Sequence, residues 1–447
     1  MPNKVQYENE LDATLFRPIY ETGKGFYITV GILLLIILWA LIMYITQIWF
    51  GLGVTGMDQT ISWGFYIVNF VFFIGISHAG TLISAILRLS RAEWRRPITR
   101  MAEVITAIVL AIGGLHPILD LGRPDRVLNI FTAGRLQSPL LWDVTSITAY
   151  FTASTVYLYL PMIPDIAKLR DKGGKLTWFY NFLSWGWQGT EYQKKVLNRA
   201  ISILMVMVIP IAISVHTVIS YIFSMTLQPG WHSTIFGPYF VVGAIFSGIA
   251  ALLILMIVSR RVFHLEDYLK KIHFQYLSTL LLIMSLLWFY FTFSEYLTGI
   301  FGSEPHEMEI IHYKFTGTYA LFFWGMLLCN FIIPVVILSF KKFKTITGIL
   351  IASIAVVIGM WLERLNIVVP SLANPRMELP IGIYIPSVVE WALFLGGIAV
   401  FILGFVLFSK FFPVISIWEI EEGRKEGIKE VEERVHSYLP GKETVSE

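Results

Sequence analysis

The chain has 447 residues, of which 56% are hydrophobic and 15% are charged, against about a quarter charged in typical soluble domains. Its net charge of +3 is too small to favour binding to nucleic acid. The single cysteine, Cys329, excludes an intrachain disulfide, a cysteine zinc site and an iron–sulfur cluster held by this chain, and we expect no metal site. The composition therefore predicts an integral membrane protein.

Ten apolar runs are long enough to cross a hydrocarbon core of about 30 Å, which takes about 20 helical residues. The predicted spans are 26–50, 62–88, 100–119, 139–160, 200–224, 235–259, 275–297, 314–339, 346–368 and 386–409. Residues 1–25 contain several acidic side chains and no small-residue cleavage site. We therefore expect a cytoplasmic N-terminal segment there rather than a signal peptide.

The loops alternate in charge. Lys and Arg are frequent after spans two, four, six and eight and are missing after spans one, five and seven. The positive-inside rule then predicts a multi-pass protein of the cell (inner) membrane with both termini cytoplasmic. The outer loop 120–138 is the exception, because it contains Arg123, Arg126 and Arg135. Either pairing with Asp120 and Asp125 or contact with a partner protein could keep these cations there.

Spans two and six begin alike. "TISWGFYIVNF" and "TIFGPYFVVGA" both start with Thr-Ile, and each span continues with small residues one turn apart and ends at a basic loop. We therefore predict an all-α membrane protein with two four-helix bundles of the same topology, about 62–224 and 235–368, and two flanking helices. The membrane domain would cover 26–410. The charged stretch 411–447 is predicted to be a solvated cytoplasmic helical tail.

Titratable side chains at membrane depth are costly and are candidates for function. A rise of about 1.5 Å per residue assigns each of them a depth within its span. Those predicted near the outer face are His116, Asp120, Asp143, His216, Glu295, Glu363 and Arg364. His78 is predicted in the inner half instead, which makes it and His216 a poor axial pair for haem.

Simpler explanations stay open for each of these groups. Asp143 could cap the fourth span, and His116 could be a hydrogen-bonded histidine at a helix interface. Glu363 and Arg364 could be an ion pair at a helix end. Asp120 and Arg123 are three residues apart and could form a local pair.

Three of the outer groups have the spacing of a proton-accepting pocket. His116 and Asp120 share one helix face if the helix continues through Pro117, and Asp143 begins the next helix. A histidine and two carboxylates in a partly apolar pocket can accept protons near neutral pH. The aromatic residues around them include Tyr66 and Trp142. Such a pocket suits a flat, lipid-soluble ring with polar ends, and a quinone fits that description.

Several strings resemble the NrfD/PsrC family, most closely the ten-span branch found in alternative complex III (ActC and ActF) and in the Qrc complex. They are "DLGRPDR", "SPLLWDV", "PGWHSTIFGPYFVVGA", "FTFSEYLTG" and "WLERLNIVVPSL", and the resemblance runs from about residue 26 to 410. It implies two four-helix bundles, no haem or iron–sulfur cluster bound by this chain, and exchangeable quinone or menaquinone at the outer face. It also implies an iron–sulfur subunit docked outside, often with multihaem cytochrome c and a second NrfD-like subunit.

Two positions depart from that branch, in which a His usually precedes "LGRP" and an Asp often follows the His-Thr of span five. This chain has Asp120 and Ile222 there. His116, one turn earlier, can substitute for the first.

The resulting hypothesis is a quinol-interacting subunit of a respiratory oxidoreductase, not catalytic alone. Asp143 with His116 or Asp120 would bind the quinol head group and take its protons. The pocket would also include Trp142, Tyr66 and Arg123. His78, His216, Glu295 and Glu363 would relay protons or only brace the bundles. The alternative is a secondary transporter or ion-translocating subunit without a redox role. The direction of electron flow and the quinone type stay open.

Overall fold

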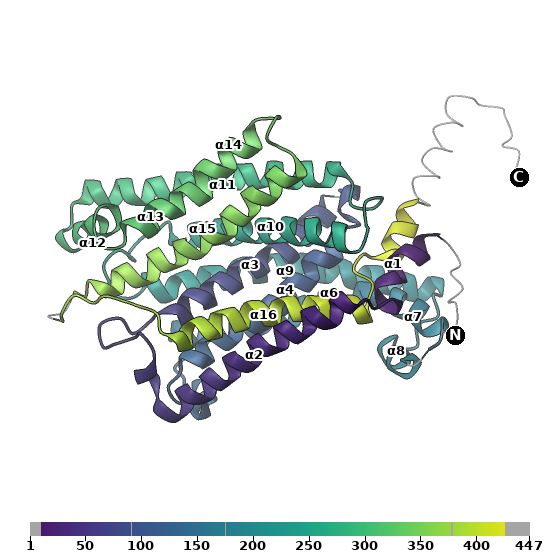
Figure 1. Ribbon diagram of the computed structural model, residues 1–447, viewed down its shortest axis with the longest axis horizontal. Helices are drawn as coiled ribbons and strands as arrows, with labels where there is room; N and C mark the ends of the chain where they lie inside the picture. Colours follow the sequence, from purple (N-terminus) through teal and green to yellow (C-terminus); the bar gives the residue numbers. More distant parts are fainter. Residues whose placement is uncertain (1–9, 91, 175, 377–378, 425–447) are drawn as a thin grey trace, which may run out of the picture.

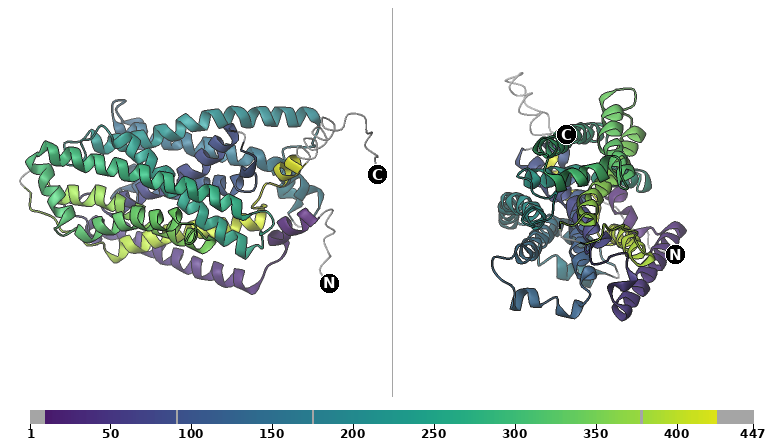
Figure 2. Two further views of the ribbon diagram at one scale, coloured as in Figure 1. Left: turned by 90° about the horizontal axis from the view of Figure 1, so that it is seen from above. Right: turned by 90° about the vertical axis from the view of Figure 1, so that its left-hand side faces the viewer.

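The computed structural model describes residues 10–90, 92–174, 176–376 and 379–424, with the side chains of 10–14, 79, 81 and 82 left undescribed. Within these ranges the secondary structure is helical, with no strand. The long helices run along one elongated body (Figures 1 and 2). Helix α1 (Glu10–Tyr20) and the segment after α16 (Val388–Phe411) lie at the same end of it.

Each predicted span coincides with a helix. The helices of the spans are α2 (Lys24–Phe50), α3 (Phe65–Leu89), α4 (Thr99–Asp120), α6 (Pro139–Tyr159), α9 (Glu191–Ser224), α10 (Phe236–Val262), α11 (Lys271–Gly302), α13 (Ala320–Leu327) continued through the π-turn η5 (Leu328–Ile332) into α14 (Ile333–Ser339), α15 (Ile346–Ala373) and α16. Short helices in the connections are η1 (Leu52–Val54), η2 (Glu93–Arg95), η3 (Pro124–Arg126), α5 (Asn129–Thr132), η4 (Leu160–Met162), α7 (Ile163–Asp171), α8 (Thr177–Leu183) and α12 (Pro305–Phe315).

Nine of the described helices are long and apolar enough to cross a membrane, with α13 to α14 counted as one, and α6 is not among them. The reason is its many hydroxyl side chains. Thr145, Thr148, Thr152 and Thr155 each donate to the carbonyl four residues earlier, at 2.7 to 2.8 Å. Hydroxyls bonded in this way are satisfied inside the helix. Helix α6 packs against α4 and α9, as the fourth span was expected to do.

The helices pack as two groups of four. Helices α3, α4, α6 and α9 contact one another around the first group, and α10, α11, α13 to α14 and α15 form the second. Helix α3 contacts both α10 and α15 and so joins the two groups. The fold is therefore the predicted pair of four-helix bundles with flanking helices. The expected duplication and the domain boundaries rest on the sequence and stay predictions.

The two flanking helices, α2 and α16, pack against each other along their length (Figure 1). A Cβ atom built on Gly396 would lie 2.5 Å from the Cβ atom of Ala40. Small residues at this crossing therefore let the two backbones approach closely, as in other helix pairs in lipid.

The beginning of the predicted solvated tail is buried, so that prediction was wrong for the part of the tail that is described. Ile415 and Ile417 are fully buried, and Glu419 is 3% exposed. Glu419 pairs with Arg88 at 2.5 Å and with Arg95 at 3.1 Å. Apolar residues between the charges allow this segment to pack on the ends of the bundle helices. Residues 425–447 lie outside the described residues.

A buried ion pair anchors the same segment. The guanidinium of Arg100 donates to the carboxylate of Asp165 at 2.6 Å, and both side chains are at most 2% exposed. Asp165 also accepts the backbone N–H groups of Ile417 and Trp418 at 3.0 Å. One carboxylate thus connects α4, α7 and the C-terminal segment.

Asp165→Asn should therefore destabilise the protein, because it leaves Arg100 buried without a counter-charge. The expected loss is about 3–5 kcal/mol, with faster proteolysis between residues 413 and 424. Thermal unfolding in detergent and limited proteolysis measure the two effects. Asp125→Asn is the matched control, since its partner Arg123 is 65% exposed. Equal unfolding temperatures for the two variants would contradict the anchoring role.

Candidate functional site

His116 and Asp120 lie on one face of α4, because the helix continues through Pro117 to Asp120. This is the geometry expected from the helical spacing. His116 is 2% exposed, and its Nδ1 atom lies 2.9 Å from the carbonyl oxygen of Ile112. Its Nε2 atom is buried and has no hydrogen-bond partner among the described residues. One ring nitrogen of His116 is therefore available to a ligand or a water molecule.

Asp143 does not cap α6, so that simpler explanation was wrong. The N-cap position is Ser138, and Asp143 is the fifth residue of the helix. Its side chain is 5% exposed, and its Oδ1 atom is buried without a partner in the described part of the chain. A carboxylate oxygen left unpaired in an apolar setting is costly.

Asp120 faces the flanking helices. The hydroxyl of Tyr66 donates to Gln47 Oε1 at 2.5 Å, and Gln47 Nε2 donates to the carbonyl of Leu119 at 2.7 Å. Tyr66 is fully buried and lies within electrostatic range of Asp120 and Glu390. Asp120 Oδ1 is buried and lacks a partner among the described residues.

Glu390 was missed by the sequence analysis. It closes a capping box at the start of α16 by accepting the N–H of Ser387 at 2.8 Å, and it also accepts the N–H of Gly56 at 2.7 Å. The hydroxyl of Tyr384 donates to it as well. Burial, and then the neighbouring Glu390, raise the pKa of Tyr384, which keeps this phenol protonated. The pattern "SVVE" signals such a cap, but nothing in it shows that the cap would lie near Asp120.

Arg123 and Trp142 lie in a more exposed position. Arg123 pairs with Asp125 at 2.8 Å, and the two side chains are 65% and 57% exposed. Arg123 therefore pairs with Asp125 rather than with Asp120. Trp142 is 38% exposed, and its Nε1 donates to the carbonyl of Leu136 at 2.5 Å.

His78 and His216 are in contact, so the prediction that they lie in opposite halves of the membrane was wrong. Their ring centroids are 3.8 Å apart, and both side chains are fully buried. His78 is thirteen residues from the start of α3, and His216 is eight residues from the end of α9. The ends of these helices are therefore offset by roughly five residues, or about 7 Å, which depth counting could not reveal. Two rings in direct contact leave no room for a haem plane between them.

A buried ion pair lies within electrostatic range of His216. Arg364 Nη1 is 2.7 Å from Glu363 Oε2, and the side chains are at most 2% exposed. The guanidinium lies over the ring of Phe240 at 5.1 Å. A Cβ atom on Gly243 would come within 3.0 Å of Arg364 Nη2. Gly243 on α10 thus leaves room for Arg364, which lies in the interior of α15 rather than at its end.

Further polar contacts lead from Glu363 toward α12. Trp288 Nε1 donates to Glu363 Oε1 at 2.8 Å. Tyr239 lies within hydrogen-bonding range of Glu363, and Tyr296 lies within electrostatic range of both Glu363 and Glu295. Glu295 accepts the hydroxyl of Ser233.

The four residues predicted as relays, His78, His216, Glu363 and Glu295, therefore follow one polar line across α3, α9, α15 and α11, which is buried from His78 to Glu363 and half-buried at Glu295. His116 and Asp120 lie near the end of α4 and Asp143 near the start of α6, and the hydrogen bonds and ion pairs of the described residues do not join these three side chains. Within the described residues, no group of three or more His, Cys, Asp or Glu side chains is arranged to hold a metal ion.

Comparisons with known proteins agree with this architecture. Residues 53–375 match the protein family described as polysulphide reductase, NrfD. A membrane subunit of a putative dimethyl sulfoxide reductase of Halobacterium salinarum is 28% identical over 256 residues, which is 56% of each chain. The match thus spans little more than half of that relative.

Two further relatives are matched over most of their length. A selenate reductase subunit of Mesobacillus selenatarsenatis is 24% identical over 90% of this chain and 95% of its own. The Hdr-like menaquinol oxidoreductase integral membrane subunit of Archaeoglobus fulgidus is 25% identical over 83% and 89% of the two chains.

The stability of the protein should depend on pH through Lys314, which lies at the end of α12. Burial lowers the pKa of this amine from 10.5 to about 8, while the nearby Glu295 opposes the shift. The unfolded chain therefore binds more protons than the folded one between pH 8 and 10.5, so stability rises with pH across that window. We expect wild type to gain up to roughly 3 kcal/mol relative to Lys314→Met from pH 7.5 to 10.5. Thermal unfolding of both proteins across this range is the measurement, and parallel curves would contradict it.

Proposed function

Because the chain belongs to the polysulphide reductase NrfD family, we propose that it is the quinol-interacting membrane subunit of a respiratory oxidoreductase complex. It binds quinol, menaquinol in particular, near the outer face of the membrane. Electrons pass to an iron–sulfur subunit docked outside, and protons are released or relayed. The names of the three relatives, two of them reductase subunits and one a menaquinol oxidoreductase membrane subunit, support this class of complex.

Three buried polar atoms without a partner in the described structure support the proposal most directly. His116 Nε2, Asp120 Oδ1 and Asp143 Oδ1 are all buried, and none has a hydrogen-bond partner among the described residues. Buried polar atoms are nearly always paired, so atoms of this kind call for a ligand or ordered water. A quinol head group supplies hydroxyls that carboxylates and a neutral imidazole can accept.

The polar line between His78 and Glu295 supports a proton route. Its members bridge the two bundles, and ionisable residues inside a membrane commonly mark such relays. We assign His78, His216, Glu363 and Glu295 to this route. We place Arg123 and Trp142 at the outer rim of the quinol site, where their exposed side chains can contact a docked subunit.

Asp143→Asn should reduce quinol oxidation by the assembled complex at least about 100-fold, the usual loss when a positioned proton acceptor is removed. Assembly should be unaffected, because Asn has nearly the same shape and Oδ1 has no protein partner to lose among the described residues. Steady-state quinol oxidation and subunit stoichiometry are the measurements. Asp125→Asn, an exposed acid on the same connection, is the control. Full activity of Asp143→Asn would remove Asp143 from the mechanism.

Relay and bracing roles can be separated at the Glu363–Arg364 pair. Glu363→Gln and Arg364→Met should each cost about 3–5 kcal/mol, because each leaves one buried charge unpaired. The double variant should recover most of that stability, since no buried charge remains. We expect its quinol turnover to stay low although it is stable. Recovery of turnover together with stability would show that the pair only braces the bundles.

The alternative function, a transporter or ion-translocating subunit without redox role, differs in its partners. Mass spectrometry of whatever co-purifies with the chain in mild detergent distinguishes the two. An iron–sulfur protein in stable stoichiometry, with or without multihaem cytochrome c or a second subunit of the same family, supports the quinol proposal. A chain that purifies alone has no electron outlet, and the alternative then takes its place.

A further inference from the structure

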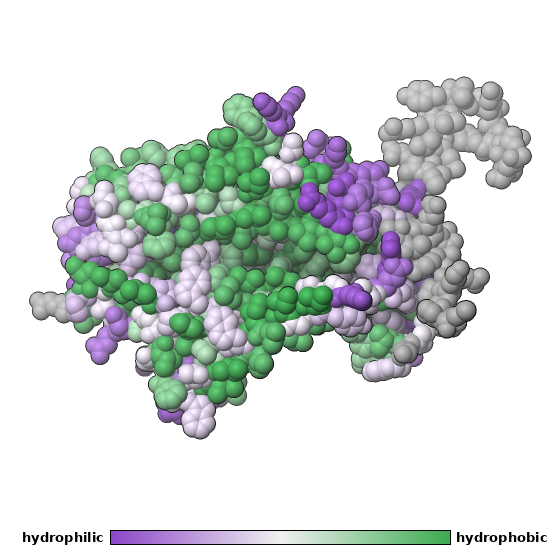
Figure 3. All heavy atoms as spheres, viewed as in Figure 1, coloured by the Kyte–Doolittle hydropathy of each residue, from purple (hydrophilic) through white to green (hydrophobic). Residues whose placement is uncertain are grey.

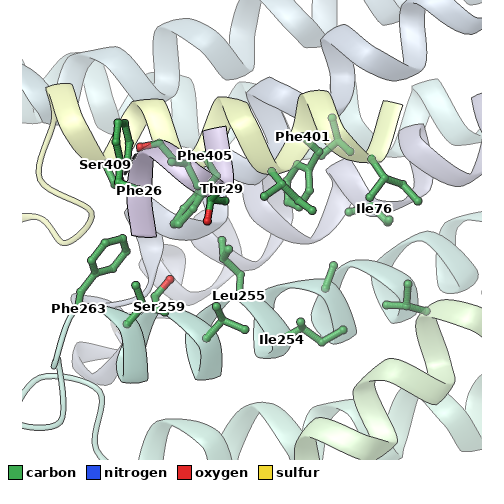
Figure 4. Close-up of a pocket in the computed structure, with 18 of the residues that line it drawn as sticks. Phe26, Thr29, Ile76, Ile254, Leu255, Ser259, Phe263, Phe401, Phe405 and Ser409 are labelled. Carbon is green, nitrogen blue, oxygen red and sulfur yellow. Dashed lines mark hydrogen bonds between the residues drawn. The ribbon is translucent and has the colours of Figure 1, made fainter. Parts of the chain in front are cut away.

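A long apolar groove separates the α2–α16 pair from the second bundle. It has a volume of about 1130 Å³ and lies between α16 and α2 on one side and α10 and α15 on the other (Figure 4). Its lining along α16 runs from Trp391 to Lys410. This stretch of α16 rises about 28 Å, close to the thickness of a hydrocarbon core. Figure 3 shows the corresponding hollow as a hydrophobic surface with hydrophilic residues gathered at one end.

The polar lining is concentrated at that one end. Arg17, Glu21, His264 and Lys410 all line the groove there. Lys410 is held in place because its Nζ donates to the carbonyls of Pro18 and Glu21, both at 2.6 Å, and to the hydroxyl of Thr22 at 3.1 Å. Arg17 pairs with Glu21 at 2.8 Å. After the Arg17–Glu21 pair is counted, this end keeps the charge of Lys410, with His264 beside it. This is a basic pocket between membrane helices, of the kind that binds anionic lipid head groups.

Ser259 adds an independent observation. It is 1% exposed and lines the groove, and its Oγ atom is buried without a hydrogen-bond partner among the described residues. Figure 4 shows it on α10, facing the space toward α16. Ser409 on the opposite wall is satisfied, because it donates to the carbonyl of Val406 at 2.7 Å. An unpaired hydroxyl in lipid surroundings calls for an acceptor brought in by the occupant.

The position of Ser259 along α10 indicates which acceptor its hydroxyl bonds. Ser259 is three residues from the end of α10, about 4.5 Å along the axis. A diacyl phospholipid whose phosphate lies at the basic end places its ester carbonyls just below that level. A polyprenyl tail lying in the groove would present only hydrocarbon to Ser259 and to the cations.

We propose that the groove holds one anionic glycerophospholipid. Its acyl chains pack along α16 and α10, an ester carbonyl accepts the hydroxyl of Ser259, and its phosphate lies between Arg17, His264 and Lys410. The lipid fills the space between the flanking pair and the second bundle and so joins them. This assignment is independent of the proposed quinol chemistry.

The test uses the full chain purified in mild detergent, with native mass spectrometry and added phosphatidylglycerol as the probe. Wild type should retain one phosphatidylglycerol per chain and bind it more tightly than phosphatidylcholine. Ala251→Trp fills the groove and should abolish retention. Ser259→Ala should weaken binding about two- to tenfold, the usual effect of losing one hydrogen bond.

Matched controls lie outside the groove. Ser214→Ala removes an exposed hydroxyl that bonds to its own helix, and Ile203→Trp adds bulk at a position 53% exposed on α9. Both should bind phosphatidylglycerol as wild type does. Retention by Ala251→Trp, equal binding of the two lipids, or a quinone in place of the lipid would overturn the proposal. If Ala251→Trp fails to fold, Ser259→Ala still decides, because it removes a group that has no partner in the described part of the protein.

Discussion

Hydrocarbon offers no hydrogen bonds, so a polar side chain between membrane helices must be met by another part of the chain or by something bound to it. The Glu363–Arg364 pair is the strongest case, with both side chains buried and 2.7 Å between their charged atoms. The room that Gly243 leaves beside Arg364, the indole of Trp288 and the ring of Phe240 all serve this one ion pair. These partners lie on α10 and α11, so the pair is held within the second bundle.

The same constraint separates structural polar groups from candidate functional ones. Along α6 the threonine hydroxyls bond to their own helix, and Asp165 is saturated by Arg100 and two backbone N–H groups. Each of these groups already has its partner within the protein. His116, Asp120, Asp143 and Ser259 keep atoms without a hydrogen-bond partner within the described structure, and so do His216, Glu363 and Arg364. The proposed quinol site, the proposed proton route and the lipid groove all contain such atoms.

Sequence reasoning succeeded where a property depends on one helix alone. Span positions follow from the length of apolar runs, and the shared face of His116 and Asp120 follows from helical spacing. It failed where two helices must be placed relative to each other. The contact of His78 with His216 depends on an axial offset that no run length encodes, and Glu390 meets the Tyr66 region only because the last span packs beside the first. The buried tail was missed because its few apolar residues lie among many charges.

The position of the partners along the chain also bears on how the protein is made. Glu363 and Arg364 are sequence neighbours, so α15 carries its own counter-charge and can enter the bilayer as a neutral unit before any other helix has reached it. Arg100 differs, since its partner Asp165 is synthesised 65 residues later. That arginine lies at the beginning of α4, where water at the membrane surface can hold it in the interval. Arg364, the more deeply placed of the two arginines, thus enters the membrane with its counter-charge beside it.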